Sequence, residues 1–176
     1  MKKKKIAVFK DFKIFQDDDI LKHFSPKDIS LVNGIGSLPG SNIRKDIFKK
    51  YKKNNFEFIE VISPQSFISR YAILEEGAHV LANSIINSNA KIGANTIINS
   101  GAIVEHDCNI GKNNHIAPGA SLSGSVFTGK NVHIGTGANI IQGINIGDNV
   151  MIGEGSTVTK DIKANKKLYV AKPYLK

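Results

Sequence analysis

The sequence predicts a parallel β-helix preceded by a short α/β segment, and three observations support this fold class. Aliphatic residues recur at every sixth position between Ile62 and Val158. Small or β-branched residues recur four positions later, and glycine often follows the aliphatic residue directly. A period of six fits neither an α-helix nor an ordinary alternating strand, so each hexad is expected to form one short strand and one turn.

The repeat is interrupted only by Thr128. The aliphatic positions are Ile62, Ile68, Leu74, Val80, Ile86, Ile92, Ile98, Val104, Ile110, Ile116, Leu122, Ile134, Ile140, Ile146, Ile152 and Val158. Three hexads are expected to make one triangular coil, whose aliphatic residues point inward and stack on the next coil at about 4.8 Å. Because each coil buries its core only against its neighbours, the array needs several repeats. We assign the β-helix to residues 61–163 and a tail to residues 164–176.

The first 60 residues are expected to form a truncated α/β (Rossmann-like) domain that binds the acceptor. Short strands are predicted at residues 6–9, 28–33 and 56–61. The apolar residues between 43 and 51 fall on one helical face, with Ser41 as the N-cap. Gly34-Ile35-Gly36 follows a predicted strand, but Leu38-Pro39 breaks the dinucleotide-binding fingerprint. A plain strand-to-helix turn is therefore the favoured interpretation.

Charge and composition narrow the classes of partner. The net charge is +9, with the lysines concentrated near the two ends of the chain. The middle of the chain is almost uncharged, so no basic stripe with aromatic residues predicts nucleic-acid binding. The apolar run Ile6–Phe9 is too short for a signal peptide or a membrane span, and a cytoplasmic protein is expected. Cys108 is the single cysteine, which excludes an internal disulfide.

A candidate catalytic group lies in the middle of the repeat. His106 is flanked by Glu105 and Asp107 in an otherwise uncharged stretch. A neighbouring carboxylate makes an imidazole more basic, which suits a general base near neutral pH. Gly124 comes three hexads later, and therefore one coil above, where its backbone N–H could face a developing oxyanion.

Four further polar or reactive residues have alternative interpretations. His115 and His133 share a column of the β-helix and could bind a metal ion, but no third histidine completes a ligand set, so no metal is expected. Cys108 occupies a small inward position without a basic neighbour, which favours packing over nucleophilic catalysis. Asn114 occupies a similar inward position and needs hydrogen-bond partners there.

Several of these segments resemble the NeuD-like sugar acyltransferases. That family includes sialic acid O-acetyltransferases and UDP-4-amino-sugar N-acetyltransferases of bacillosamine synthesis. The similar segments, which span roughly residues 20 to 165, are Val32–Ser37, Ile43–Lys45, Val104–Asn109, Ile110–Ala120, Ile134–Ala138 and Ile152–Asp161. The resemblance implies a left-handed β-helix, a homotrimer, and CoA bound between neighbouring subunits.

The resemblance also implies roles for individual residues. The general base falls on His106, the residue that orients it on Asp107, and the oxyanion amide on Gly124. The positions implied to bind CoA are His115, Gly135, Thr136 and Glu154. The positions implied on the acceptor side are Gly36 and Glu105. The family members open with a Gly-rich turn that holds the acceptor's nucleotide, and no such turn precedes Gly34 here. Weaker binding of nucleotide sugars is therefore expected.

The function predicted in this way is acetyl-CoA-dependent N-acetylation of a nucleotide-linked 4-amino-6-deoxy sugar. No serine or cysteine is placed to form an acyl-enzyme, so direct transfer is expected. The alternative within the same class is O-acetylation of sialic acid or a related sugar. Two alternatives from other classes are a γ-type carbonic anhydrase and an inactive β-helix scaffold.

Overall fold

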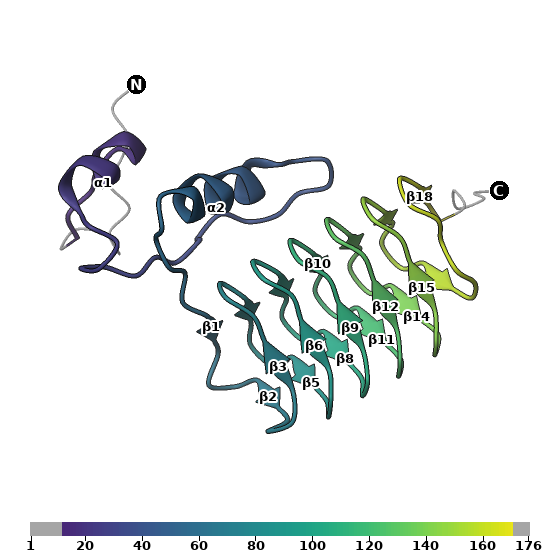
Figure 1. Ribbon diagram of the computed structural model, residues 1–176. Coiled ribbons are helices and arrows are strands. Elements are labelled where there is room, and N and C mark those ends of the chain that lie inside the picture. The colour runs from purple at the N-terminus through teal and green to yellow at the C-terminus, as the bar shows by residue number, and fades with distance from the viewer. Residues whose placement is uncertain (1–11, 171–176) are drawn as a thin grey trace.

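A computed structural model describes residues 12–170 and consists mainly of a parallel β-helix (Figure 1). Each strand has two residues, and the strands form three parallel sheets. The first sheet contains β1 (Val61–Ile62), β4 (His79–Val80), β7 (Ile97–Ile98), β10 (His115–Ile116), β13 (His133–Ile134), β16 (Met151–Ile152) and β18 (Lys167–Leu168). The second contains β2 (Phe67–Ile68), β5 (Ile85–Ile86), β8 (Ile103–Val104), β11 (Ser121–Leu122), β14 (Asn139–Ile140) and β17 (Thr157–Val158). The third contains β3 (Ile73–Leu74), β6 (Lys91–Ile92), β9 (Asn109–Ile110), β12 (Phe127–Thr128) and β15 (Asn145–Ile146).

Three rows of turns connect the sheets. We call them the first corner (first to second sheet, for example residues 135–138), the second corner (second to third sheet, residues 105–108 and 123–126) and the third corner (third to first sheet, residues 111–114). Strands pair with partners three hexads away, so that Ile116 lies between Ile98 and Ile134 in the core. From β4 to β17 the second residue of each strand is buried in the core, which confirms the predicted fold class.

Thr128, the one polar residue among the inward strand positions of the repeat, is hydrogen-bonded to a second polar residue in the core, Asn114. Thr128 and Asn114 are both about 1% exposed. The Asn114 side-chain amide donates to the Thr128 hydroxyl over 2.7 Å and to the Gly129 carbonyl over 2.9 Å. The side-chain oxygen of Asn114, Oδ1, accepts a hydrogen bond from the Val132 N–H. Because these buried polar groups satisfy each other and the backbone, Thr128 does not disrupt the β-helix.

The last coil is shorter than the others. Met151 pairs with Lys167, sixteen residues away, whereas His133 pairs with Met151 over eighteen. Ile162 pairs with Ile146, so it occupies a strand position rather than the corner position that the six-residue phase assigns to it. The ladder consequently continues to Leu168, inside the segment predicted as the tail.

Between residues 12 and 60, the chain before the β-helix has two helices and a small aromatic core. The helices are α1 (Asp17–His23), which was not predicted, and α2 (Ile43–Lys53), which was. The core contains Tyr51, Phe56 and Phe58. The strands predicted at 28–33 and 56–61 are reduced to one parallel bridge between Leu31 and Phe58, and the strand predicted at 6–9 lies outside the described residues. The N-cap of α2 is Asn42, next to the predicted Ser41.

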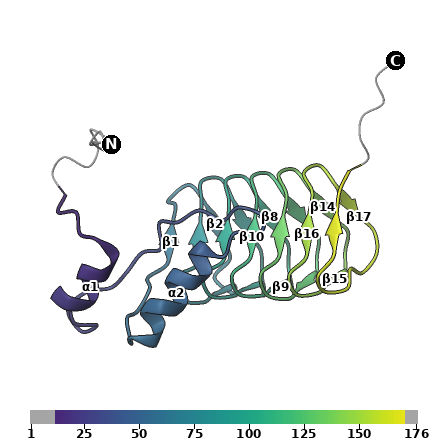
Figure 2. The ribbon, with the colours of Figure 1, turned by 90° about the horizontal axis from the view of Figure 1, so that it is seen from above.

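Arg44 fastens the loop before α2 to the β-helix. It is 6% exposed, and its guanidinium donates to the carbonyl oxygens of Asn33 and Ile35 in the loop. Its Nε donates to the carbonyl oxygen of Asn95 at the third corner over 3.2 Å. Both ribbon views show α2 alongside the N-terminal half of the β-helix (Figures 1 and 2). The loop therefore lies over the outer face of the first sheet.

Candidate active site

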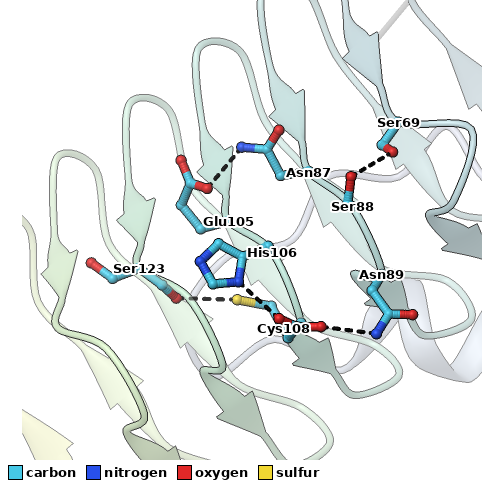
Figure 3. A network of polar contacts seen from close by, with 9 residues as sticks. Ser69, Asn87, Ser88, Asn89, Glu105, His106, Cys108 and Ser123 are labelled. Carbon is cyan, nitrogen blue, oxygen red and sulfur yellow. Dashed lines mark hydrogen bonds and ion pairs between the residues drawn. The ribbon is translucent and has the colours of Figure 1, made fainter.

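His106 and Asp107 form a hydrogen-bonded pair in the turn after β8, at the second corner (Figure 3). The His106 Nδ1 lies 2.8 Å from the Asp107 Oδ2, and both side chains are about half exposed. Because an ionised carboxylate only accepts hydrogen bonds, the proton of the neutral ring lies on Nδ1. The Nε2 atom of His106 then carries the lone pair that can accept a proton from a substrate.

Asp107 is held by a second donor in addition to His106. The Asn89 side-chain amide, one coil below, donates to the Asp107 Oδ1 over 2.8 Å. The hydrogen bond from His106 is the main cause that lowers the pKa of the Asp107 carboxyl, and the hydrogen bond from Asn89 adds to it. Asp107 is consequently a carboxylate at neutral pH, as the orientation of His106 requires.

Gly124 approaches the imidazole so closely that any side chain there would have to displace the ring. A Cβ atom built on Gly124 would lie 2.6 Å from the His106 Cε1 and 2.7 Å from its Nε2. Its backbone φ lies outside the left-handed region, so the close contact is the reason for glycine. Within residues 12–170, the Gly124 N–H donates no hydrogen bond. A free amide thus lies next to the free nitrogen of His106.

Cys108 determines which way that amide points. Its thiol donates to the Ser123 carbonyl oxygen over 3.2 Å from inside the β-helix (Figure 3). The carbonyl and the N–H of a trans peptide point in opposite directions, so the Gly124 N–H of the same peptide points outward. Burial raises the pKa of the Cys108 thiol to about 11, which keeps the proton that this hydrogen bond needs. Cys108 is therefore an inward, unreactive thiol.

Glu105, predicted on the acceptor side, precedes His106 in the same turn and is half-buried. Its Oε2 accepts a hydrogen bond of 2.8 Å from the Asn87 side-chain amide, one coil below (Figure 3). Two asparagines of the lower coil thus support the two carboxylates that flank His106. Neither asparagine was identified from the sequence, although stepping back three hexads from each carboxylate would have found both.

His115 lies on the outer face of the first sheet, under the loop before α2. Its Nδ1 lies 2.9 Å from the Ser37 carbonyl oxygen, and its Nε2 lies 3.0 Å from the Asn99 side-chain amide. The ring therefore donates to the loop and accepts from Asn99, which defines a neutral tautomer. Burial lowers the pKa of His115. Its ring meets that of His133 edge-on, at 4.9 Å between centroids.

The remaining predicted residues line two neighbouring pockets on this side of the molecule. Gly36 and His115 line the pocket between the loop and the first sheet. Gly135 and Glu154 line the adjoining pocket, together with His133 and Tyr169. The exposed Thr136 follows Gly135 in the same turn of the first corner.

The predicted residues thus form two separate groups in one chain. Glu105, His106, Asp107 and Gly124 lie at the second corner, which we call the histidine group. His115, Gly135, Thr136 and Glu154 lie on the first sheet and the first corner, and Gly36 lies in the loop over this sheet; we call these five residues the pocket group. The second sheet separates the two corners. Within one chain the predicted residues therefore lie at two neighbouring corners rather than in one cluster.

Buried neutral histidines predict a loss of stability in acid. Burial and the Arg44 charge lower the pKa of His79 to about 4, and burial lowers that of His133 to about 4. An unfolded histidine has a pKa of about 6.5, so below this pH the unfolded chain binds more protons. The free energy of unfolding should be highest above pH ~6.5 and fall between pH ~6.5 and ~4, by up to about 1.4 kcal/mol per pH unit for each histidine.

Thermal unfolding midpoints measured at a series of pH values test this prediction. His133→Asn removes one of the two histidines and should make the unfolding midpoint less dependent on pH. His23→Asn changes an exposed residue of α1 and should leave the pH dependence of the midpoint unchanged. A midpoint that stays constant between pH ~7 and ~5 would contradict the neutral burial of these rings.

The chain is similar to known hexapeptide-repeat proteins in sequence and in structure. The model of the bacterial transferase hexapeptide (six repeats) family matches residues 89–124 and 125–160. A mutant of perosamine N-acetyltransferase from Caulobacter crescentus, in complex with CoA and GDP-perosamine, has a TM-score of 0.79 and 29% identity, with 87% of this chain and 72% of that chain covered.

Two other solved structures are similar. The acetyltransferase domain of PglB from Neisseria gonorrhoeae, in complex with acetyl coenzyme A, has a TM-score of 0.83 and 28% identity, with 94% of this chain and 80% of that chain covered. WeeI from Acinetobacter baumannii has a TM-score of 0.70 and 30% identity, with 74% of this chain and 64% of that chain covered.

The repeat, the fold and these relatives define the class of protein: the chain is a hexapeptide-repeat acyltransferase. Within that class, the predicted resemblance to the NeuD-like sugar acyltransferases is confirmed. In the described part of the chain, no cluster of three or more histidine, cysteine or acidic side chains is arranged to hold a metal ion. Neither helix there has the length and apolar character needed to cross a membrane.

Proposed function

We propose that this enzyme transfers an acetyl group from acetyl-CoA to the amino group of a nucleotide-linked 4-amino-6-deoxy sugar. The observation that carries the proposal is the arrangement at the second corner. The His106 Nε2 is free to accept a proton, its Nδ1 is bound to Asp107, and the free N–H of Gly124 lies beside it. A base next to an unused amide donor is what acyl transfer to a nucleophile requires.

The transfer follows from the properties of these groups. The acceptor amine attacks the thioester carbonyl of acetyl-CoA and gives up a proton to the His106 Nε2. Asp107 keeps the ring oriented and stabilises the imidazolium that forms. The Gly124 N–H donates to the oxyanion of the tetrahedral intermediate. When the intermediate collapses, the C–S bond breaks and CoA leaves as a thiol, taking up a proton from the imidazolium.

A nucleotide-linked amine is favoured by the relatives. The perosamine N-acetyltransferase was solved with CoA and GDP-perosamine together, and an N-acetyltransferase acts on an amine. The PglB domain binds acetyl coenzyme A. No comparable observation supports a sialic acid acceptor, and the absence of a metal-ligand cluster in residues 12–170 gives no support to a carbonic anhydrase.

The proposal includes an active site shared between two copies of the chain. The histidine group and the pocket group lie at different corners, and a second copy of the chain could bring its own histidine group next to the pocket group of the first. We propose a homotrimer in which CoA and the acceptor bind to the pocket group of one subunit and meet His106 of its neighbour. Such a head-to-tail arrangement closes into a ring.

Product analysis tests the reaction. The enzyme is incubated with acetyl-CoA and, separately, with UDP- and GDP-linked 4-amino-6-deoxy sugars, the matching 4-hydroxy sugars and sialic acid. We expect mass spectrometry to show one added acetyl group on the amino sugars, together with stoichiometric release of CoA. Acetylation of sialic acid or of the hydroxy sugars alone would overturn the amine assignment, and no transfer to any acceptor would overturn the proposed function.

Gly124→Ala is expected to reduce turnover without unfolding the protein. The new methyl group would collide with the imidazole of His106, which is half exposed and can rotate away, but it would meet no backbone atom within that distance. Displacing the base by even about 1 Å should lower kcat roughly 10–100-fold. Steady-state kinetics and thermal unfolding measure the two effects separately.

Gly111→Ala is the matched control. Its Cβ would lie 2.3 Å from the carbonyl oxygen of Gly129, a backbone atom that cannot move away. We expect a loss of about 2–4 kcal/mol in the free energy of unfolding, as for other overpacked sites. Normal kcat in Gly124→Ala would contradict the proposed position of the base.

A further inference from the structure

We propose that Asn89 is a positioning residue for acetyl transfer, holding the Asp107 carboxylate in the orientation that binds His106. This inference rests on the proposed function, because it assigns Asn89 a role in the same site. Asn89 lies one coil below Asp107, at the same position of the second corner. It does not touch the imidazole and would act only through the carboxylate.

The carboxylate is fixed at both of its oxygens. Oδ2 lies 2.8 Å from the His106 Nδ1, and Oδ1 accepts a hydrogen bond of 2.8 Å from the Asn89 amide (Figure 3). Asp107 is about half exposed, so water competes for both oxygens. A single contact with an exposed imidazole would leave the carboxylate free to rotate about its terminal torsion. The second contact removes that freedom and defines the plane in which His106 is held.

The Asn89–Asp107 contact has the same form as the steps of an asparagine ladder at another corner of the β-helix. At the third corner, Asn131 donates to Asn149, and Asn149 donates to Asn165, each over 2.9 Å. The residues of these ladders adopt left-handed backbone angles, with φ of 64° at Asn89, 60° at Asp107 and 56° at Asn149. Asparagine and aspartate tolerate this conformation better than most residues.

The ladder of the second corner differs in its last member. A carboxylate cannot donate, so the ladder that begins at Asn89 ends at Asp107. The next position, one coil above, is occupied by Ser125. Asp107 therefore accepts a hydrogen bond from Asn89 in the coil below and donates none to the coil above. Its second oxygen is left to bind His106. The same backbone geometry that stabilises the third corner thus provides a rigid support for the catalytic pair.

Three variants separate a positioning role from a structural one. Asn89→Gly keeps a residue suited to positive φ but removes the amide. Asn89→Asp keeps the shape but replaces the donor by a second carboxylate facing Oδ1. Asn149→Gly is the matched control, because Asn149 is exposed, has the same backbone conformation and carries a ladder contact on each side.

Kinetics provide the first readout. For Asn89→Gly we expect kcat to fall about tenfold or more, with the KM values for acetyl-CoA and acceptor unchanged. Asn149→Gly should keep the kcat of the unaltered enzyme. Asn89→Asp should lose more activity at pH ~8 and recover part of it towards pH ~6, because one of two facing carboxyls then takes up a proton and can donate to the other.

NMR titration of the Asp107 carboxyl provides a readout that does not depend on activity. Removing the Asn89 amide should raise the pKa of Asp107 in Asn89→Gly and leave it unchanged in Asn149→Gly. The inference is overturned if both Asn89 variants retain full kcat, or if Asn89→Gly and Asn149→Gly lose activity equally. If Asp107 titrates as expected but the unaltered enzyme transfers no acetyl group, it is the proposed function that fails, and the catalytic role of Asn89 fails with it.

Discussion

His106→Ala is expected to lower kcat by roughly 10²–10⁴-fold, the range typical for loss of a general base. The imidazole provides the nitrogen that lies beside the free N–H of Gly124, and alanine leaves no group there to take the proton. The binding of acetyl-CoA should change little, because the pocket group lies at another corner of the β-helix. Steady-state kinetics give kcat, and calorimetric titration gives the affinity for acetyl-CoA.

His23→Ala is a suitable control for this variant, since His23 is exposed on α1 and far from the second corner in the chain. It should retain the activity of the unaltered enzyme. Near-normal turnover of His106→Ala would show that another group acts as the base. Loss of activity on addition of a chelator would instead point to a metal-dependent reaction and would contradict direct acyl transfer.

The β-helix could be predicted in detail because its periodicity is encoded locally. Each hexad carries an inward aliphatic residue, and stacking at one strand spacing requires only that the period stays constant. The prediction was less accurate where the period changes. Between Met151 and Lys167 two residues are missing from the coil, and the phase gives no indication of where they are lost. The polar position Thr128 is explained only by Asn114, its partner in the core.

The segment before the β-helix was harder to predict for a different reason. The apolar face of α2 was visible in the sequence, but strand pairing depends on contacts between distant residues. In the part of this segment that the structure describes, only Leu31 and Phe58 pair, and the surrounding residues pack through aromatic side chains and through Arg44. A buried arginine that donates to three backbone carbonyls carries no periodic signal.

The candidate catalytic pair was recognisable from the sequence because its residues are adjacent. His106 and Asp107 form their hydrogen bond within one turn. The supporting contacts join different coils and are less visible in the sequence. Asn89 contacts Asp107 from one coil below, and Cys108 contacts Ser123 in the coil above. The motifs follow one another along the chain, but the corners of a β-helix point in different directions. The separation of the histidine group from the pocket group could therefore not be predicted from the motifs.

That separation predicts complementation between two variants that are inactive alone. His106→Ala removes the base at the second corner. Thr136→Trp places a large side chain on the exposed first corner, where it should block the proposed CoA groove without touching the core. Each variant alone should have about 1% of normal activity or less. Each should also unfold at the temperature of the unaltered enzyme.

Coexpression of the two variants in equal amounts should restore about a quarter of the normal activity. In a head-to-tail ring, a site is intact when a subunit with normal His106 adjoins one with a normal first corner, which random mixing produces in about one pairing in four. If both groups served a site within one chain, every subunit would carry a defect and the mixture would stay at the background level. Mixed trimers, isolated through two different affinity tags, have one intact site of their three and should therefore show about a third of normal activity, which distinguishes these outcomes. Recovery would show that His106 acts on the acetyl-CoA bound by its neighbour.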